Sequence, residues 1–135
     1  MHPYIHAQNN PDKPAYIMAN TGETVTYRQL EDRSNQMAQY FRSLGLKRGD
    51  GIAIFMENNP RYFEICWAAQ RSGLYYTAIS SRLTAGEVEY IINDCQAQLL
   101  VTSTEKKEVA AQLVPLTGHL KKRLMVGDTI DGYED

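Results

Sequence analysis

A run of hydroxyl side chains is the stretch of this sequence that comes nearest to a phosphate-binding motif. Thr102, Ser103 and Thr104 follow a short apolar segment, and hydroxyl groups at such a position can bind phosphate oxygens. The run lacks the glycines that let a backbone approach a phosphate, and Glu105 places a negative charge beside it. We therefore predict that Ser103 or Thr104 caps a helix and binds no nucleotide.

The glycines and lysines do not supply a phosphate site elsewhere. Gly45, Gly49 and Gly51 have the spacing G-x-x-x-G-x-G, which fits neither the dinucleotide fingerprint nor the P-loop, so a turn is expected. Four lysines stand in polar contexts without a glycine-rich neighbour, and an isolated exposed charge attracts phosphate only weakly because salt screens it. These are Lys106, Lys107, Lys121 and Lys122.

The segment Glu57–Pro60 lies where a buried strand should end, which is where open α/β sheets bind ligands. A helix N-terminus at this place could attract an anion, but the carboxylate of Glu57 would repel one. We expect Asn59 to cap a helix that has Pro60 at its first position.

Histidine and cysteine are too dispersed to form a recognisable catalytic or metal site. His2, His6 and His119 have no partner at ligand spacing and no Ser or Asp arrangement typical of a triad, so surface positions are expected. Cys66 and Cys95 lie in apolar helical patterns, where a free thiol acts as a small hydrophobe.

Three aromatic residues remain as possible pocket residues. Trp67 lies in a segment that is apolar on all sides, which favours a core position over a pocket wall. Tyr75 and Tyr76 are neighbours in a predicted strand, so they must point to opposite faces of a sheet. The sequence thus assigns no catalytic, cofactor-binding or metal-binding residue.

Composition restricts the class of protein. The 135 residues are 43% hydrophobic with a formal net charge of −2, as in one globular domain that needs no disulfide or metal. Scattered Lys and Arg residues give no basic patch for nucleic acid. The amino terminus lacks the apolar run of a secretory signal, and no segment approaches the about 20 apolar residues of a membrane span. A cytoplasmic protein without a transmembrane segment is expected.

The first elements that must position these residues are a hairpin and a helix. After a polar lead-in, 15–20 and 24–26 flank a Gly-containing connection of hairpin length. Thr26 and Gln29 then have the spacing of a capping box, and apolar residues recur at helical intervals until Gly45 ends the helix.

Strands and helices alternate in the rest of the chain. The apolar segments 51–56 and 74–79 are predicted to be central strands, with a helix buried nearly all round between them. Thr84 and Glu87 begin the next helix with a second capping box. The remaining predictions are a strand at 99–102, a helix at 105–113, a strand at 124–126, and a loop or a cut at the polar end 127–135.

This alternation predicts an α/β fold, in which an N-terminal hairpin precedes a mostly parallel open sheet with helices on both faces. A rival within this class is a receiver-like regulatory domain, which needs an acidic cluster at the strand ends, where the sequence offers only Glu57. The predicted core comprises Ile52, Ile54, Phe55, Phe63, Trp67, Ile79, Val88, Ile92, Leu100 and Val101.

Two stretches resemble signatures of the AMP-forming acyl-CoA synthetases, which belong to the adenylate-forming superfamily. Residues 25–30, VTYRQL, are similar to the motif L-[TS]-Y-x-E-L, with Gln29 in place of Glu. Residues 71–80, RSGLYYTAIS, are similar to K-A-G-x-x-Y-x-P-[LI]-[DN], with Ala78 in place of Pro and Ser80 in place of Asp or Asn.

The resemblance implies that residues 1–135 are the N-terminal subdomain of a larger ligase, and that the chain stops before its active site. Such an enzyme activates a fatty or related carboxylic acid with ATP and Mg²⁺ as an acyl-adenylate, then transfers the acyl group to coenzyme A. The phosphate loop, the ribose-binding Asp and the lysine of the C-terminal domain have no matching residues here.

Three expectations follow for the chain itself. It should be inactive alone, and it should not bind the parent's cofactors ATP, Mg²⁺ and coenzyme A. It should associate with itself, because a sheet without its neighbours exposes apolar faces and open edges. The alternative reading is a stand-alone α/β binding or regulatory module without catalysis.

Overall fold

The computed structural model describes residues 2–135, in which helices and strands alternate after a short helix and a hairpin. A 3-10 turn, Thr104–Lys106, precedes α5. The helices are α1 Pro3–Asn9, α2 Tyr27–Ser43, α3 Tyr62–Arg71, α4 Ala85–Asp94 and α5 Lys107–Leu113. The strands are β1 Pro14–Ile17, β2 Thr24–Thr26, β3 Gly51–Phe55, β4 Tyr75–Ile79, β5 Ala97–Ser103 and β6 Lys122–Val126.

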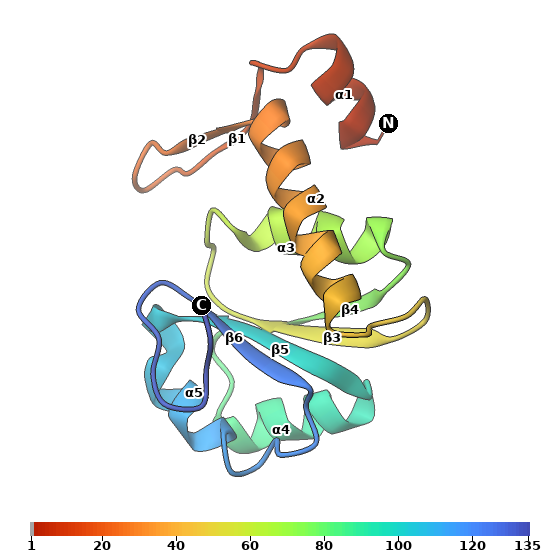
Figure 1. Ribbon diagram of the computed structural model, residues 1–135. Helices are drawn as coiled ribbons and strands as arrows, with labels where there is room; N and C mark the ends of the chain where they lie inside the picture. The colour runs from red at the N-terminus through yellow and green to blue at the C-terminus, as the bar shows by residue number, and fades with distance from the viewer. Residues whose placement is uncertain (1) are drawn as a thin grey trace.

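The molecule has three layers built around one parallel sheet. The strand order is β4-β3-β5-β6, and each neighbouring pair is parallel, whereas β1 and β2 form a separate antiparallel hairpin. Figure 1 shows α2 and α3 on one face of the sheet and α4 and α5 on the other. The predicted fold class is therefore confirmed.

Alternate side chains of the strands enter two cores on opposite faces of the sheet. Ile52 and Ile54 of β3 pack with Phe41 of α2 in the first core. Ala53 and Phe55 point the other way and pack with residues of α4 and α5 in the second core. Eight predicted core residues are at most 3% exposed, namely Ile52, Ile54, Phe55, Ile79, Val88, Ile92, Leu100 and Val101.

Both predicted capping boxes are present and explain where two helices begin. The Thr26 side chain accepts from the Gln29 N–H at 3.2 Å, and the Gln29 side chain accepts from the Thr26 N–H at 3.0 Å. Thr84 and Glu87 make the same reciprocal pair at the start of α4. Each capping box satisfies backbone N–H groups that a helix N-terminus otherwise leaves without a partner.

Two predictions about burial were wrong. β4 is an edge strand and not a central one, and Tyr75 is 74% exposed. The helix α3 is not buried all round, because Phe63 is 52% exposed and Trp67 is only partly buried, although both were expected in the core. Both residues lie on the side of α3 that points away from the sheet, where Phe63 meets the hairpin and Trp67 meets the start of α1.

The polar lead-in contains a helix that the sequence reading missed. α1 is short, and the His2 ring accepts a hydrogen bond from the Tyr4 N–H at its start. The rings of His2 and Trp67 meet edge to face at 4.7 Å between centroids, and His6 stacks on Tyr27 at 4.9 Å. These tertiary contacts hold α1 against α2 and α3, since an isolated helix of this length is unstable in water.

The polar end of the chain, 127–135, packs back onto the sheet. The prediction of a loop or a cut without a closing role was therefore wrong. The Glu134 N–H donates to the Arg123 carbonyl at 2.9 Å, and the Met125 N–H donates to the Glu134 carbonyl at 2.7 Å. Tyr133 is buried, and its hydroxyl donates to the Ala110 carbonyl at 2.8 Å.

Candidate functional site

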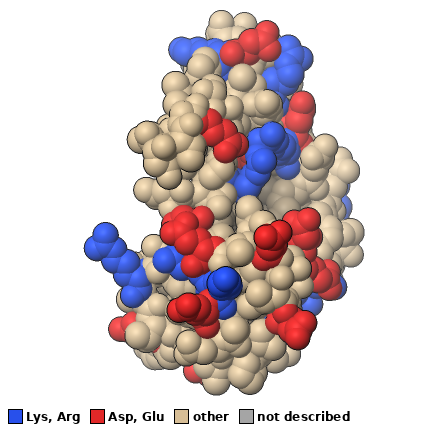
Figure 2. Space-filling view, turned by 90° about the vertical axis from the view of Figure 1, so that its left-hand side faces the viewer, with Lys and Arg blue, Asp and Glu red and all other residues tan. Residues whose placement is uncertain are grey.

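The carboxyl ends of the parallel strands are the candidate site, because ligands of open α/β sheets bind there. Between these ends and the β1–β2 hairpin lies a hollow of about 460 Å³. Figure 2 looks onto this side of the molecule and shows acidic and basic side chains interspersed over it. The hollow is lined by Met18, Asn20, Thr21, Glu23, Glu57, Asn58, Pro60, Ser81 and Glu105.

Glu57 is the centre of a hydrogen-bond network that joins two strand ends. Its carboxylate accepts from the Ser103 hydroxyl at 2.5 Å and from the Asn59 amide at 2.9 Å. Partial burial alone would raise the pKa of Glu57, but these hydrogen bonds outweigh it and hold the pKa below its ordinary value. The carboxylate is thus occupied in linking β3 to β5.

The hydroxyl run after β5 has a structural role other than the predicted helix cap. Ser103 precedes the 3-10 turn but makes no capping hydrogen bond, because its hydroxyl is used by Glu57. The Thr104 hydroxyl donates to the carbonyls of Val126 and Asp128. The Thr102 hydroxyl is buried and donates to the Phe55 carbonyl at 2.5 Å. Sequence spacing could not reveal these partners, since they lie on other strands or just after them.

The segment after β3 begins the next helix later than predicted. The Asn59 side chain accepts from the Arg61 N–H at 2.9 Å, as a capping residue would. However, α3 starts at Tyr62, and Pro60 lies in the turn before it, so Pro60 is not the first helical residue. The Pro60 carbonyl instead accepts from the Tyr16 hydroxyl at 2.5 Å, which ties the hairpin to this turn.

The glycine segment forms a turn, as predicted, and it lies at the amino ends of the strands β3 and β4. Gly45 and Gly49 have φ values of +78° and +94°, which residues with a side chain rarely adopt. Gly51 is the first residue of β3. None of the three lies at the carboxyl ends of the strands.

The hollow beside the hairpin does not fit a nucleotide phosphate. Its lining contains three carboxylates, from Glu23, Glu57 and Glu105, and no Lys or Arg. Phosphate sites need positive charge or converging backbone N–H groups, so this lining repels ATP.

Within residues 2–135, no group of three or more His, Cys, Asp or Glu side chains could hold a metal ion. No helix among these residues is long and apolar enough to cross a bilayer.

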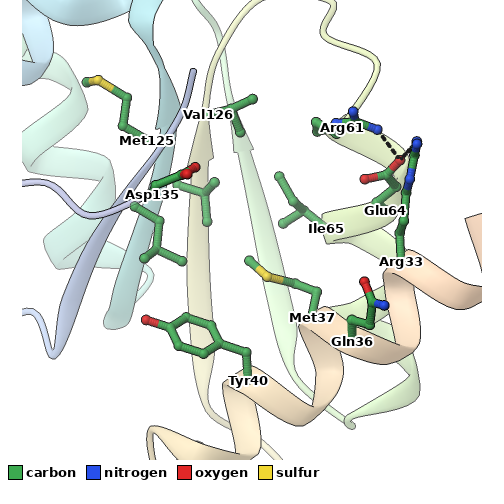
Figure 3. Close-up of a pocket in the computed structure, with 12 residues that line it drawn as sticks. Arg33, Gln36, Met37, Tyr40, Arg61, Glu64, Ile65, Met125, Val126 and Asp135 are labelled. Atoms are coloured by element: carbon green, nitrogen blue, oxygen red, sulfur yellow. Dashed lines mark hydrogen bonds and ion pairs between the residues drawn. The ribbon is translucent and has the colours of Figure 1, made fainter. Parts of the chain in front are cut away.

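A second hollow, of about 490 Å³, opens beside the first core. Figure 3 shows Arg33 and Arg61 converging on Glu64 at one end of it, with Tyr40 at the other. The Glu64 side chain is 7% exposed and accepts from Arg33 at 3.0 Å and from Arg61 at 3.1 Å. The remaining lining is mostly apolar and comes from α2, α3, β5 and β6, together with Asp135. The ion pairs neutralise the buried carboxylate and join α2 to α3.

The remaining candidate residues do not gather at either hollow. His2 and His119 are exposed, and His6 is partly buried against Tyr27. Both cysteines are free thiols, as predicted, and burial raises the pKa of Cys66 to about 11. A thiol that stays protonated at neutral pH is a poor nucleophile.

Replacing Glu57 by Gln should test the strand-end network by its dependence on pH. Because folding lowers the pKa of Glu57, the stabilisation it provides is present above the unfolded value of about 4.3. It is lost as the pH falls through the folded pKa. We expect Glu57→Gln to lower the free energy of unfolding by about 1 kcal/mol at neutral pH and by less near pH 3.

Urea unfolding at both pH values measures this difference. Glu105→Gln is the matched control, since Glu105 is exposed in the same hollow and its side chain makes no hydrogen bond within residues 2–135. It should change stability little at either pH. A Glu57→Gln effect that is equal at both pH values would contradict the assignment.

The family of the chain follows from comparison with known proteins. The family model for the AMP-binding enzymes matches residues 4–132, which is nearly the whole chain. The chain belongs to the AMP-binding enzyme family. The matched region includes both stretches that resemble acyl-CoA synthetase signatures, so that resemblance is confirmed for this family member.

Curated relatives of this family member are much longer than it is. A fatty acid–[acyl-carrier-protein] ligase, ScoC, of Streptomyces coeruleorubidus is 36% identical over 75% of the chain and 19% of its own length. A long-chain-fatty-acid–CoA ligase of Escherichia coli is 36% identical over 67% of the chain and 16% of its own. Human long-chain fatty acid transport protein 1 is 30% identical over 87% of the chain and 18% of its own. The chain therefore spans less than a fifth of these relatives.

Solved structures show the same fold in other members. An acetoacetyl-CoA synthetase of Streptomyces lividans superposes with a TM-score of 0.88 at 20% identity, covering 98% of this chain and 23% of that one. A fatty acyl-CoA synthetase of Mycobacterium tuberculosis gives 0.82 at 23% identity, covering 92% of this chain and 25% of that one. At these identities the likeness establishes the fold alone.

Proposed function

We propose that residues 1–135 are the N-terminal scaffold subdomain of an ATP-dependent acid–thiol ligase. The parent enzyme activates a fatty or related carboxylic acid as its acyl-adenylate and transfers the acyl group to coenzyme A. ATP, Mg²⁺ and coenzyme A bind to parts of the parent outside this subdomain, and the enzyme acts in the cytoplasm. The match of residues 4–132 to the AMP-binding enzymes carries the proposal.

The chemistry of the strand ends supports a scaffold role. Glu57, Ser103 and Thr102 direct their polar groups to one another or to backbone carbonyls. The adjoining hollow has an acidic lining, which does not fit the triphosphate of ATP. Phosphoryl chemistry needs positioned cations and backbone donors around the phosphates, and these must come from the rest of the parent.

The proposal predicts that the chain and its parent differ completely in activity. Calorimetry of ATP–Mg²⁺ against residues 1–135 should show no binding in the micromolar range. Acid-dependent pyrophosphate exchange with fatty acids of several chain lengths should be absent as well. The full-length product of the gene should show both, with release of AMP when coenzyme A is added.

Each outcome separates the proposal from its alternative. Micromolar ATP binding to residues 1–135 would place the nucleotide site within this chain, and the strand ends at Glu57, Ser80 and Thr102 would be mutated first. A gene product without pyrophosphate exchange for any carboxylic acid would favour the stand-alone binding or regulatory module. Acyl transfer to an acyl carrier protein and not to coenzyme A would correct the acceptor alone.

A further inference from the structure

The outer edge of β4 presents unpaired backbone groups. β4 pairs with β3 only and ends the sheet. The Tyr75 N–H donates to the Asp50 carbonyl of the neighbouring chain segment at 2.9 Å. Because backbone groups alternate in direction along a strand, Thr77 and Ile79 also face β3. The N–H and C=O groups of Tyr76 and Ala78 therefore point away from the sheet.

This edge lacks the features that usually protect an open strand. Soluble proteins place charged residues, Pro or bulges on such edges to prevent pairing with another chain. Residues 74–81, LYYTAISS, contain no charged residue and no Pro, and β4 pairs with β3 without a bulge. Its two tyrosines add exposed aromatic surface, with Tyr75 74% and Tyr76 36% exposed.

We propose that β4 pairs antiparallel with β4 of a second copy, with the two-fold axis passing through Thr77. In this register Tyr76 lies opposite Ala78 of the second copy, and the reciprocal pair repeats across the axis. Each pair exchanges two backbone hydrogen bonds, so every outward N–H and C=O of Tyr76 and Ala78 finds a partner. The two four-stranded sheets join into one of eight strands.

The second copy is favoured because this strand is complementary to itself. Centring the pairing on Thr77 overlaps all five residues of β4, whereas any other symmetric register overlaps fewer. Tyr75 then lies opposite Ile79, whose side chain is already buried in the second core, so the pairing gains mainly from its backbone hydrogen bonds. No charged residue faces a like charge across the pairing, since β4 is uncharged. A two-fold interface needs this match of a surface with itself.

Ala78→Pro tests the proposal without removing a bond within the sheet. Proline has no N–H, and the N–H of Ala78 points outward, away from β3. The variant therefore keeps the hydrogen bonds between β3 and β4. It loses one intermolecular hydrogen bond at each of the two symmetric Tyr76–Ala78 pairs. Sedimentation equilibrium over a range of concentrations should show a dimer for the unaltered chain and at least tenfold weaker dimerisation for the variant. Tyr90→Ala is the matched control, since Tyr90 is 71% exposed on α4, and it should leave dimerisation unchanged.

Cysteine crosslinking tests the register and does not depend on the proline variant folding. In a Cys66→Ala, Cys95→Ala background, Thr77→Cys should form a disulfide-linked dimer on mild oxidation, because the two copies of residue 77 face each other at the axis. Ala78→Cys should not, because its opposite residue is Tyr76. An unaltered chain that stays monomeric at about millimolar concentration would overturn the proposal. Equal crosslinking at positions 77 and 78, or equal dimerisation of Ala78→Pro, would overturn the assignment to this edge.

Discussion

Replacing Arg33 and Arg61 together by Met should lower the free energy of unfolding by about 3 kcal/mol. Glu64 is 6% exposed, and these two guanidinium groups are the partners of its carboxylate. Without them a buried negative charge stays unpaired, which costs about 3–5 kcal/mol in buried sites. The lower end is expected because the arginine side chains are 34% and 36% exposed, so water can reach part of the site.

The charge, and not the packing of the arginines, should cause this loss. Adding Glu64→Leu to the double variant removes the unpaired carboxylate and should restore most of the stability, since apolar replacement of a whole ion-pair cluster is often neutral. Arg28→Met is a control at an exposed position, where Arg28 and Asp12 lie 3.6 Å apart with little burial. It should cost less than about 1 kcal/mol. A triple variant as unstable as the double variant would contradict the explanation.

Elements with local signals could be predicted from the sequence. Thr26 with Gln29 and Thr84 with Glu87 specify helix starts through contacts three residues apart, which the spacing alone reveals. The continuous apolar run of β3 indicates a strand covered on both faces, and β3 lies inside the sheet between β4 and β5. The parallel sheet then follows from the alternation of strands and helices.

Features that depend on distant partners could not be predicted in this way. β4 is nearly as apolar as β3, so its sequence cannot show that only one side of it is paired. The short helix α1 has weak helical signals and is held by ring contacts such as His2 with Trp67. Trp67 is consequently a contact residue for α1 and not part of a core.

The candidate site was predictable in place but not in detail. The strand ends at Glu57 and Thr102 follow directly from the predicted strands. Their roles do not, because Ser103 meets Glu57 across 46 positions of sequence. In the sequence, the hydroxyl run 102–104 resembles a weak phosphate motif. In the structure, its Ser103 hydroxyl links the ends of two strands through Glu57. The family signatures, which lie in scaffold segments, carried more functional information than any polar residue did.

Phe55→Ala should destabilise the chain by about 3–5 kcal/mol, whereas Phe63→Ala should cost less than about 1 kcal/mol. Both phenylalanines look like core residues in the sequence. Phe55 is fully buried in the second core, and its removal leaves a cavity between the sheet and the helices α4 and α5. Phe63 is 52% exposed and contacts the Tyr16 ring at 5.2 Å between centroids, so solvent fills the space it vacates.

Urea unfolding followed by circular dichroism measures both variants under the same conditions, and the pair serves as its own control. The deleted atoms are identical, so the difference between the two variants reports burial and not the chemistry of phenylalanine. An effect of similar size at both positions would contradict the arrangement of α3, whose outward face carries Phe63. It would mean that the hairpin or a second molecule covers this face in solution, because only burial makes the loss of a phenyl ring costly.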